Sequence, residues 1–514
     1  MLIKTFGYTV VGVNATRVTV EVSIAQGINF YLVGLPDNAV KESQQRISTA
    51  LRHHGYKMPG KQITVNMAPA DIRKEGSAYD LTIAVGILAA SEQILASKTA
   101  DYAVMGELAL DGEIRQVKGA LPIAVKAKEE GFKGILLPAQ SAKEAAVVEG
   151  LEVYAVQSLE DVVRFFNSDD HGLNTVNINI QDAFAAQTQY PEHDFADVKG
   201  QESIKRALEI AAAGGHNVIL IGPPGAGKTM LSKRLPSILP PLTIEEALET
   251  TKIHSVAGKS GKSGGGLVVR RPFRNPHHTI SDVALVGGGN NPQPGEISLA
   301  HNGVLFLDEL PEFKRTVLEV MRQPLEERVV SISRAKFNVE YPASFMLVAS
   351  MNPCPCGFYN HPEKECVCSP GVVQKYLNKI SGPLLDRIDL HVEVTPVSYN
   401  EISNRRSSES SHSIRERVIK ARQIQTARYK GHSGTHCNAQ MGSNDLKTYC
   451  RLSSAGGELL KNAMQRLGLS ARAYDRILKV GRTIADLEAS QAIETHHIAE
   501  AIQFRSLDRD NWAG

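Results

Sequence analysis

The run Gly222–Thr229 reads GPPGAGKT, a complete phosphate-binding loop, and it constrains the fold of the surrounding chain more than any other feature. The apolar run 217–221 before it predicts a buried strand, and the residues that follow predict a helix. Glycines at these positions let successive backbone N–H groups turn toward phosphates, and the helix adds the positive end of its dipole. The loop therefore predicts a nucleoside triphosphate site. A glycine-rich turn without a ligand is the weaker alternative.

Each position of the loop has an expected role in holding ATP. Lys228 is expected to reach the β- and γ-phosphates, and the hydroxyl of Thr229 is expected to ligate Mg²⁺. The residues expected to contact the nucleotide are Gly222, Pro223, Pro224, Gly225, Ala226, Gly227, Lys228, Thr229 and Met230.

The remaining chain is too long for one hydrophobic core: 514 residues predict about three domains. A formal net charge of +2 neither supports nor excludes nucleic acid, so a DNA site must come from local patches. No apolar run approaches the roughly 18 residues of a membrane helix, and the N-terminus alternates like a strand rather than a signal peptide. We therefore expect a cytoplasmic protein that does not bind membranes.

Changes in sequence pattern divide the chain into three domains and a linker. Residues 1–168 mix strand-like runs with helical stretches, and the polar residues 169–195 are expected to form the linker. Residues 196–395 hold the phosphate loop and are expected to form an α/β core with a parallel sheet. In residues 396–514 apolar side chains recur every three and four positions, which predicts a small helical domain.

A second run, Gly303–Glu309, consists of apolar residues that end in two carboxylates. Asp308 is expected to hold Mg²⁺ through water, and Glu309 to orient or deprotonate the attacking water. The alternative is a strand followed by a helix N-cap, which acidic residues also favour. The phosphate loop upstream favours the catalytic interpretation.

Two further polar residues are candidates for the nucleotide site. Asn352 comes directly after a strand-like run and is a candidate for positioning the attacking water, although asparagine is also common in turns. Arg387 lies in a short acidic turn, where an exposed arginine could reach the nucleotide of a neighbouring subunit. Its alternative is an ordinary salt bridge within the chain.

The motifs GPPGAGKT, GVLFLDE, VASMN and LLDRID, in this order, are similar to those of AAA+ ATPases. The run 271–281, RPFRNPHHTIS, resembles the magnesium-chelatase-like branch, and the whole chain resembles the ComM (YifB) family. The resemblance implies an α/β fold: a Lon-protease-like α+β domain, an AAA+ core on a parallel sheet, and a C-terminal helical lid. It also implies that Asn352 is the sensor-1 residue, Arg387 the arginine finger and Arg472, in the run 470–476, the sensor-2 residue.

By the same resemblance, the activity is that of a ring-shaped helicase that promotes branch migration of DNA in natural transformation. ATP and Mg²⁺ are the implied cofactors, single-stranded or branched DNA is the implied partner, and recombination proteins are candidate partners. An arginine finger from a neighbour completes the active site only between subunits, so a closed ring, usually of six, is expected. The alternative is a chelatase-like ATPase that remodels a protein partner.

The N-terminal block resembles the Lon-protease fold at the motifs KEGSA and GELALDGEIRQVKGAL. A serine–lysine protease needs a hydroxyl and an amine within hydrogen-bond reach. Aligned without gaps, the two positions fall on Ala78 and Leu121, whereas Ser77 and Lys118 lie nearby but out of register. The resemblance therefore implies a protease-dead domain used for assembly or DNA binding, and disfavours an ATP-dependent protease.

Residues 326–341 alternate on both sides of a short turn and predict a β-hairpin with Arg334 and Lys336 near its tip. Copies of such a tip around a ring would form a positive track for a phosphate backbone without base readout. The alternative is a solvated hairpin tip. The Gly- and Lys-rich run 252–274 is a second candidate for DNA contact, with a solvated flexible loop as its alternative.

Two groups of potential metal ligands stand out. His277 and His278 are adjacent and expected to point apart, so hydrogen bonding or DNA contact is favoured over a metal site. The four thiols at C-x-C spacing would satisfy a tetrahedral, structural Zn²⁺, although this spacing is tighter than usual and four free cysteines are the alternative. These thiols belong to Cys354, Cys356, Cys366 and Cys368. Cys437 and Cys450 lack partners at ligand spacing and are expected to be ordinary residues.

Overall fold

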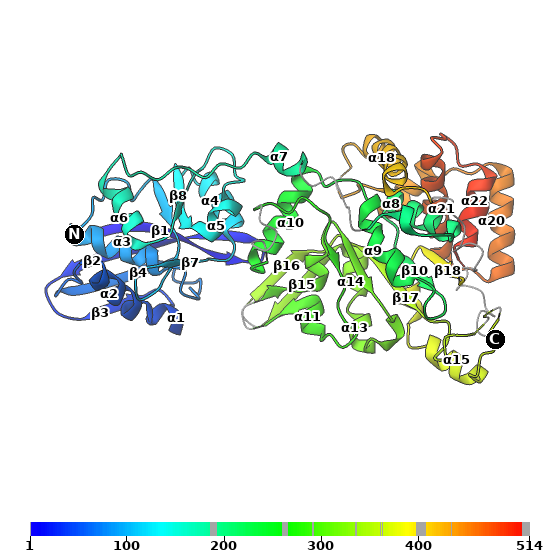
Figure 1. Ribbon diagram of the computed structural model, residues 1–514, viewed down its shortest axis with the longest axis horizontal. Helices are drawn as coiled ribbons and strands as arrows, with labels where there is room; N and C mark the ends of the chain where they lie inside the picture. The colour runs from blue at the N-terminus through cyan, green and yellow to red at the C-terminus, as the bar shows by residue number, and fades with distance from the viewer. Residues whose placement is uncertain are drawn as a thin grey trace.

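The computed structural model describes residues 2–185, 193–259, 266–289, 292–334, 337–359, 361, 363–396, 408–432 and 434–505. Three blocks follow one another along the long axis of the molecule: the N-terminal block at one end, the phosphate-loop sheet in the middle and the C-terminal helices at the other end (Figure 1). Within the described residues, every helix is too short or too polar to cross a membrane.

The N-terminal block is built on two sheets that enclose one apolar helix. Helix α3 (Asp80–Ala90) is buried at every position and packs against the first sheet, because a helix without a polar face has to be covered on all sides. The first sheet has the order β1-β2-β4-β3, with β1 (Leu2–Val11), β2 (Asn14–Ala25), β3 (Phe30–Val33) and β4 (Gln62–Ala68). The second is parallel, with β5 (Tyr102–Val104), β8 (Gly134–Pro138) and β9 (Glu152–Val156).

Short elements complete this block. They are α1 (Asn38–Lys41), α2 (Ser43–His53), β6 (Glu107–Leu108), β7 (Ile114–Arg115), α4 (Ala120–Glu129), α5 (Ala139–Ala145) and α6 (Leu159–Asn167).

The segment predicted to be a linker is partly folded. It carries helix α7 (Ile180–Ala185), and the side chains of Ile178, Ile180 and Phe184 pack against a small apolar cluster that includes Leu242. Because the segment is mostly polar, its few apolar side chains did not predict a packed helix. Residues 186–192 lie outside the described part of the chain.

The central block is a parallel sheet in the order β11-β14-β17-β10-β18. Its three central strands are buried at every residue, which explains their continuous apolar runs, since helices cover both faces of a parallel sheet. The strands are β10 (Val218–Ile221), β11 (Phe273–Arg274), β14 (Val304–Leu307), β17 (Met346–Met351) and β18 (Leu390–Glu393). The predicted α/β class is thereby confirmed.

The helices of this block are α8 (Glu202–Gly214), α9 (Lys228–Ile238), α10 (Ile244–Val256), α11 (Asp282–Val286), α12 (Glu296–Leu299), α13 (Arg315–Glu319), α14 (Arg322–Glu327), α15 (Pro370–Leu377) and α16 (Gly382–Leu385). Helix α10 extends into the run 252–274, the second candidate for DNA contact, so the alternative of a flexible loop does not hold for residues 252–256. Residues 260–265 of that run lie outside the described residues.

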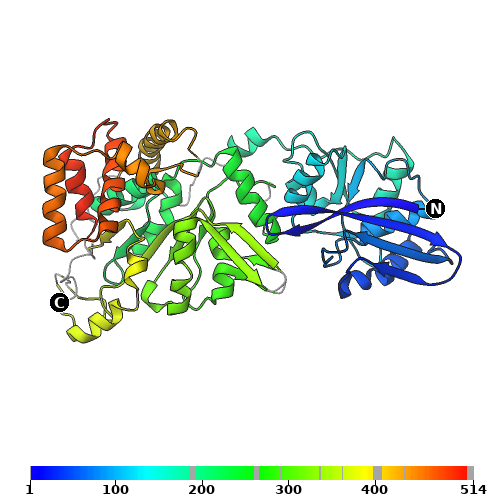
Figure 2. The same cartoon turned by 180° about the vertical axis from the view of Figure 1, so that it is seen from behind.

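Two hairpins project from the central block. One pairs β12 (Gly287–Gly288) with β13 (Gln293–Pro294). The other pairs β15 (Val329–Arg334) with β16 (Phe337–Pro342), as predicted. Lys336, predicted near its tip, lies outside the described residues. The turn between β1 and β2 reaches this second hairpin (Figure 2): a Cβ built on Gly12 would lie 2.9 Å from Cγ1 of Val339. The N-terminal block therefore contacts the hairpin directly.

The C-terminal block is helical, as predicted, and packs on α8 through α18 and α21. Its helices are α18 (Ser411–Arg428), α19 (Ser443–Tyr449), α20 (Ser454–Leu467), α21 (Ala471–Leu487) and α22 (Thr495–Gln503). A buried ion pair of 2.9 Å between Arg476 on α21 and Asp389 at the start of β18 joins this block to the central sheet.

Candidate nucleotide site and its neighbouring cysteine cluster

The phosphate loop leaves the carboxyl end of β10 and continues into α9, the strand–loop–helix arrangement that the sequence predicts. Lys228 Nζ donates hydrogen bonds to the carbonyl oxygens of Gly222 and Pro223, at 2.6 and 2.9 Å, and to Asn352 Oδ1 at 3.1 Å. Burial lowers the pKa of this ammonium group, while the carboxylates of Asp308 and Glu309 act in the opposite direction. The structure thus brings Lys228, Asn352 and the two carboxylates to one edge of the sheet.

Two oxygen groups suited to Mg²⁺ lie side by side at this edge. Thr229 Oγ1 donates a hydrogen bond of 2.7 Å to Asp308 Oδ2. Hydroxyl and carboxylate oxygens are the ligands that Mg²⁺ prefers, so the pair fits a shared ion. Ser350 Oγ bonds the other oxygen of Asp308, a contact that the sequence analysis missed. The one serine in the otherwise apolar strand β17 could have indicated that this side chain has a polar partner.

Glu309 has an unusual backbone and an unexpected partner. Its φ of 55° lies in the left-handed region, where a non-glycine residue is strained and is held by its surroundings. Its carboxylate Oε2 lies 3.4 Å from Nδ1 of His278. The expectation that His277 and His278 point apart is wrong, because their rings lie 4.1 Å apart and the Thr279 hydroxyl lies 3.0 Å from His277 Nδ1.

Arg387, the expected arginine finger, and Arg472, the expected sensor-2 residue, lie close together in the fold. The predicted exposure of Arg387 is wrong: its side chain is 11% exposed and forms an ion pair of 2.5 Å with Glu326. The side chain of Arg472 is 61% exposed and lies 3.1 Å from Asp386, the residue before Arg387. Within the described residues, no hydrogen bond or ion pair joins either arginine to the phosphate loop of its own chain.

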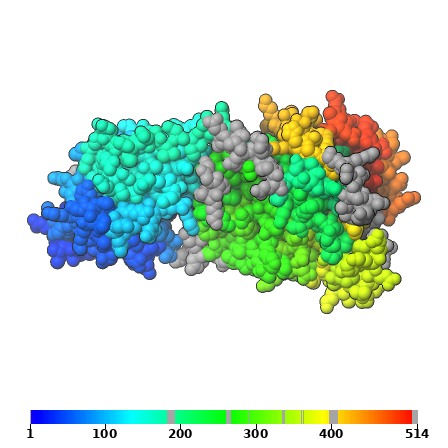
Figure 3. Space-filling view, viewed as in Figure 1, coloured from blue at the N-terminus to red at the C-terminus, as the bar shows by residue number. Residues whose placement is uncertain are grey.

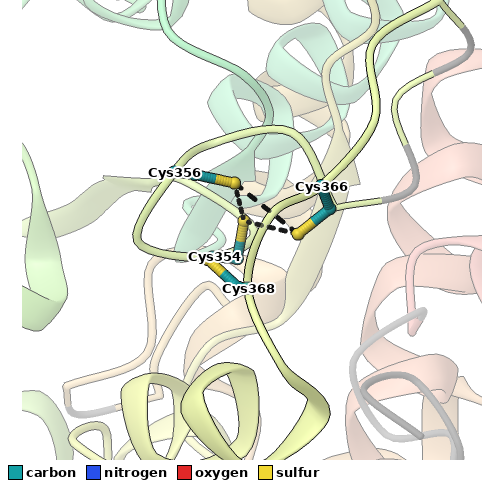
Figure 4. Close-up of side chains that lie close together, drawn as sticks. All are labelled: Cys354, Cys356, Cys366 and Cys368. Atoms are coloured by element: carbon teal, nitrogen blue, oxygen red, sulfur yellow. Dashed lines mark hydrogen bonds between the residues drawn. The ribbon is translucent and has the colours of Figure 1, made fainter.

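All six cysteines are free thiols. Figure 4 shows the sulfur atoms of Cys354, Cys356 and Cys366 facing one another, with Cys368 beside Cys354. The S–S distances are 3.3 Å between Cys354 and Cys356 and 3.6 Å from each of them to Cys366, and all four sulfurs lie within 4.8 Å of one another. Four sulfurs about 2.3 Å from a tetrahedral zinc would lie about 3.8 Å apart. The thiols are therefore spaced as a zinc site requires.

A second cluster of potential ligands has a structural explanation. His496 and His497 both approach Glu488, with ring nitrogens 3.0 Å from its carboxylate. The backbone N–H of Glu494 donates to Nδ1 of His497, so Nε2 of that ring carries the proton and donates to Glu488. A protonated Nε2 is not a metal ligand, and this group caps α22.

Ser77, Ala78 and Lys118 of the Lon-like motifs line a cavity of about 340 Å³ between the N-terminal and central blocks, whereas Leu121 is buried and does not line it. Ser77 donates its hydroxyl to the carboxylate of Glu107. Lys118 lines the same cavity and passes Gly258, with its Cε 3.0 Å from a Cβ built there. Within the described residues no hydrogen bond joins Ser77 to Lys118, which leaves the serine without an adjacent amine base.

Comparisons with known proteins agree with this fold. Residues 194–402 match the family described as magnesium chelatase, subunit ChlI, residues 20–141 match subunit ChlI of Mg-chelatase, and residues 408–505 match the C-terminal part of that subunit. Lon protease 2 of Bacillus subtilis is 28% identical over 124 residues, which are 24% of this chain and 22% of that protein.

Several relatives match nearly the whole chain. Competence protein ComM of Haemophilus influenzae is 45% identical over 500 residues, which cover 97% of this chain and 96% of that protein. YifB of Escherichia coli is 44% identical over 501 residues, with the same coverage. The chain therefore belongs to the ComM/YifB family of magnesium-chelatase-like AAA+ ATPases.

Proposed function

We propose that this protein is a ring-shaped DNA motor that uses ATP hydrolysis to drive branch migration during DNA integration in natural transformation or recombination. The observation that carries the proposal is the place of the β15–β16 hairpin. It is inserted between β14, which ends at Asp308 and Glu309, and β17, which is followed by Asn352. A force on the hairpin therefore acts on two strands whose ends carry the nucleotide site. One relative that matches nearly the whole chain is named a competence protein, which supports a competence-related role.

In this proposal each residue at the sheet edge has a separate role in ATP hydrolysis. Lys228 exchanges its carbonyl partners for the β- and γ-phosphates, while Thr229 and Asp308 hold Mg²⁺. Glu309 leaves His278 and accepts a proton from the attacking water, which Asn352 orients.

The arginines complete the site from a neighbouring subunit. Arg387, once released from Glu326, stabilises charge on the transferred phosphoryl group, and Arg472 acts from the same subunit. A head-to-tail contact of this kind closes into a ring, for which we propose six subunits. We also infer that the four clustered cysteines hold a structural Zn²⁺.

Replacing both Arg334 and Lys336 with alanine is expected to remove DNA stimulation of ATP hydrolysis and to leave the basal rate unchanged. The loss of two cations per subunit should weaken binding to single-stranded DNA by about tenfold or more and reduce its salt dependence. Hydrolysis rates with and without DNA, together with fluorescence anisotropy at several salt concentrations, measure both effects.

The matched control replaces Lys461 and Arg466, exposed cations on α20, with alanine, and should behave as the unaltered protein. If the hairpin variant retains DNA stimulation, the hairpin is not the DNA-binding element. If no DNA stimulates the unaltered protein and a protein partner does, the chelatase-like remodelling function replaces the DNA motor.

A further inference from the structure

The loop that carries the cysteines touches the phosphate loop at several points. Asn352 accepts a hydrogen bond from Lys228, and the carbonyl oxygen of Met351 accepts one of 3.2 Å from the N–H of Gly222. Five residues after Asn352, Gly357 meets Pro224: a Cβ built on Gly357 would lie 2.5 Å from Cδ of the proline ring. Gly357 also has a φ of 85°, so a larger residue is disfavoured both by its backbone and by the phosphate loop.

Two of the four thiols lie between these contact points. Cys354 is fully buried, and its carbonyl oxygen accepts a hydrogen bond of 3.0 Å from the N–H of Gly357. Cys356 precedes Gly357 directly. A group that fixes these two sulfurs therefore fixes the six-residue stretch from Asn352 to Gly357 that lies against the phosphate loop.

The cysteine-bearing segment has little apolar core of its own. Among the described residues of 353–369, only Pro353, Cys354 and Gly357 are buried, and Val367 is 86% exposed. In Figure 3 the yellow part of the chain that includes this segment stands out from a corner of the molecule. A small segment without a core depends on cross-links or a metal ion for a defined conformation.

A small cavity lies between the phosphate loop and the cysteine-bearing segment. It has a volume of about 80 Å³ and is lined by Gly222 and Pro223 of the phosphate loop on one side. Pro353, Gly357 and His361 of the cysteine-bearing segment line the other side. The phosphate loop and the cysteine-bearing segment thus lie against each other. A shift of the cysteine-bearing segment therefore changes the contacts that hold the phosphate loop in place.

We propose that Zn²⁺ bound by the four thiolates sets the affinity of the phosphate loop for ATP, because it holds Gly357 against Pro224 and Asn352 against Lys228. This inference rests on the zinc and ATP sites of the proposed function, and does not depend on DNA. Coupling between two sites is reciprocal, so bound ATP must also retain the zinc.

The test uses the full-length protein without DNA, with zinc measured by atomic absorption and ATP binding by the fluorescence of a labelled ATP analogue. The expected zinc content is about one ion per chain. Gly357→Ala should keep this zinc and bind the analogue about tenfold more weakly, because the phosphate loop loses its preorganised support. Gly371→Ala is the matched control, since a Cβ there meets nothing within 4 Å, and it should change neither quantity.

A second measurement tests the reciprocal effect on the unaltered protein. A chelating dye should remove zinc several-fold more slowly when a non-hydrolysable ATP analogue is bound. Removal of zinc should weaken analogue binding, and Cys356→Ser with Cys366→Ser should do the same while circular dichroism shows a folded chain. A zinc-free chain, full affinity in Gly357→Ala or full affinity after zinc removal would each overturn the inference. None of these results bears on whether DNA stimulates hydrolysis.

Discussion

Replacing Glu309 with glutamine is expected to lower the kcat of ATP hydrolysis by about a hundredfold or more while ATP binding is retained. Glutamine keeps the shape of the side chain and removes the carboxylate that accepts a proton from water. Within the described residues no hydrogen bond joins Glu309 to Lys228 or Thr229, the residues proposed to hold ATP. The affinity for the nucleotide should therefore stay within about twofold of the original value. Steady-state hydrolysis and equilibrium binding of a labelled ATP analogue measure the two quantities separately.

Glu312→Gln is the matched control for this experiment. Glu312 follows Glu309 by three residues, and its half-exposed carboxylate lies 3.4 Å from Lys379. A surface ion pair of this kind contributes little, so the control should hydrolyse ATP at close to the original rate. Hydrolysis that survives in Glu309→Gln would mean that another group activates the water.

Replacing Arg387 with alanine is expected to lower kcat by about a thousandfold, the effect of losing an arginine finger. A neighbouring subunit with an intact Arg387 should restore hydrolysis at the variant's nucleotide site. An equal mixture with Lys228→Ala subunits places an intact Arg387 beside an intact Lys228 at about a quarter of the interfaces of a randomly mixed ring. The mixture should therefore recover about a quarter of the original rate, although each variant alone is inactive.

This complementation separates two interpretations of Arg387, which pairs with the half-exposed Glu326 in its own chain: a finger for the neighbouring subunit, or a residue that only supports its own chain. If Arg387 only supports its own chain, mixing cannot restore a subunit that lacks it, and the rate should remain at that of the single variants. Glu326→Gln is the companion variant. Because it frees Arg387 without removing it, hydrolysis should be retained in the assembled ring.

The parts of the fold that could be predicted are those in which one short run of sequence carries the whole signal. The strands β10, β14 and β17 are buried at every position and are almost entirely apolar. The glycines of the phosphate loop predict that loop, and the alternation of the hairpin predicts its strands, without reference to distant residues. For the same reason the residues at the strand ends, including Lys228 and Asp308, could be assigned to one edge of a parallel sheet.

What could not be predicted depends on partners far apart in the sequence. Nothing near Arg387 shows that Glu326 lies within reach, and nothing near Glu309 shows that His278 does. Short helices such as α7 are stabilised by a few apolar contacts with other segments rather than by their own periodicity. The contact of Gly357 with Pro224 likewise exists only after the sheet has brought the two loops together.

The N-terminal block also has a contact that its sequence motifs could not predict. Its Lon-like motifs indicate a fold, whereas its β1–β2 turn contacts Val339 of the hairpin proposed to bind DNA. We propose that the N-terminal domain supports this hairpin, a role that does not require protease chemistry.

The most direct test of the DNA-motor function is the rate of ATP hydrolysis by the assembled protein with and without branched DNA, measured beside the conversion of a synthetic four-way junction into its migrated products. If the protein is a DNA motor, branched DNA raises the rate several-fold and junctions migrate only when ATP is hydrolysed. A rate that is the same with and without DNA, together with junctions that stay unmigrated, would contradict this function.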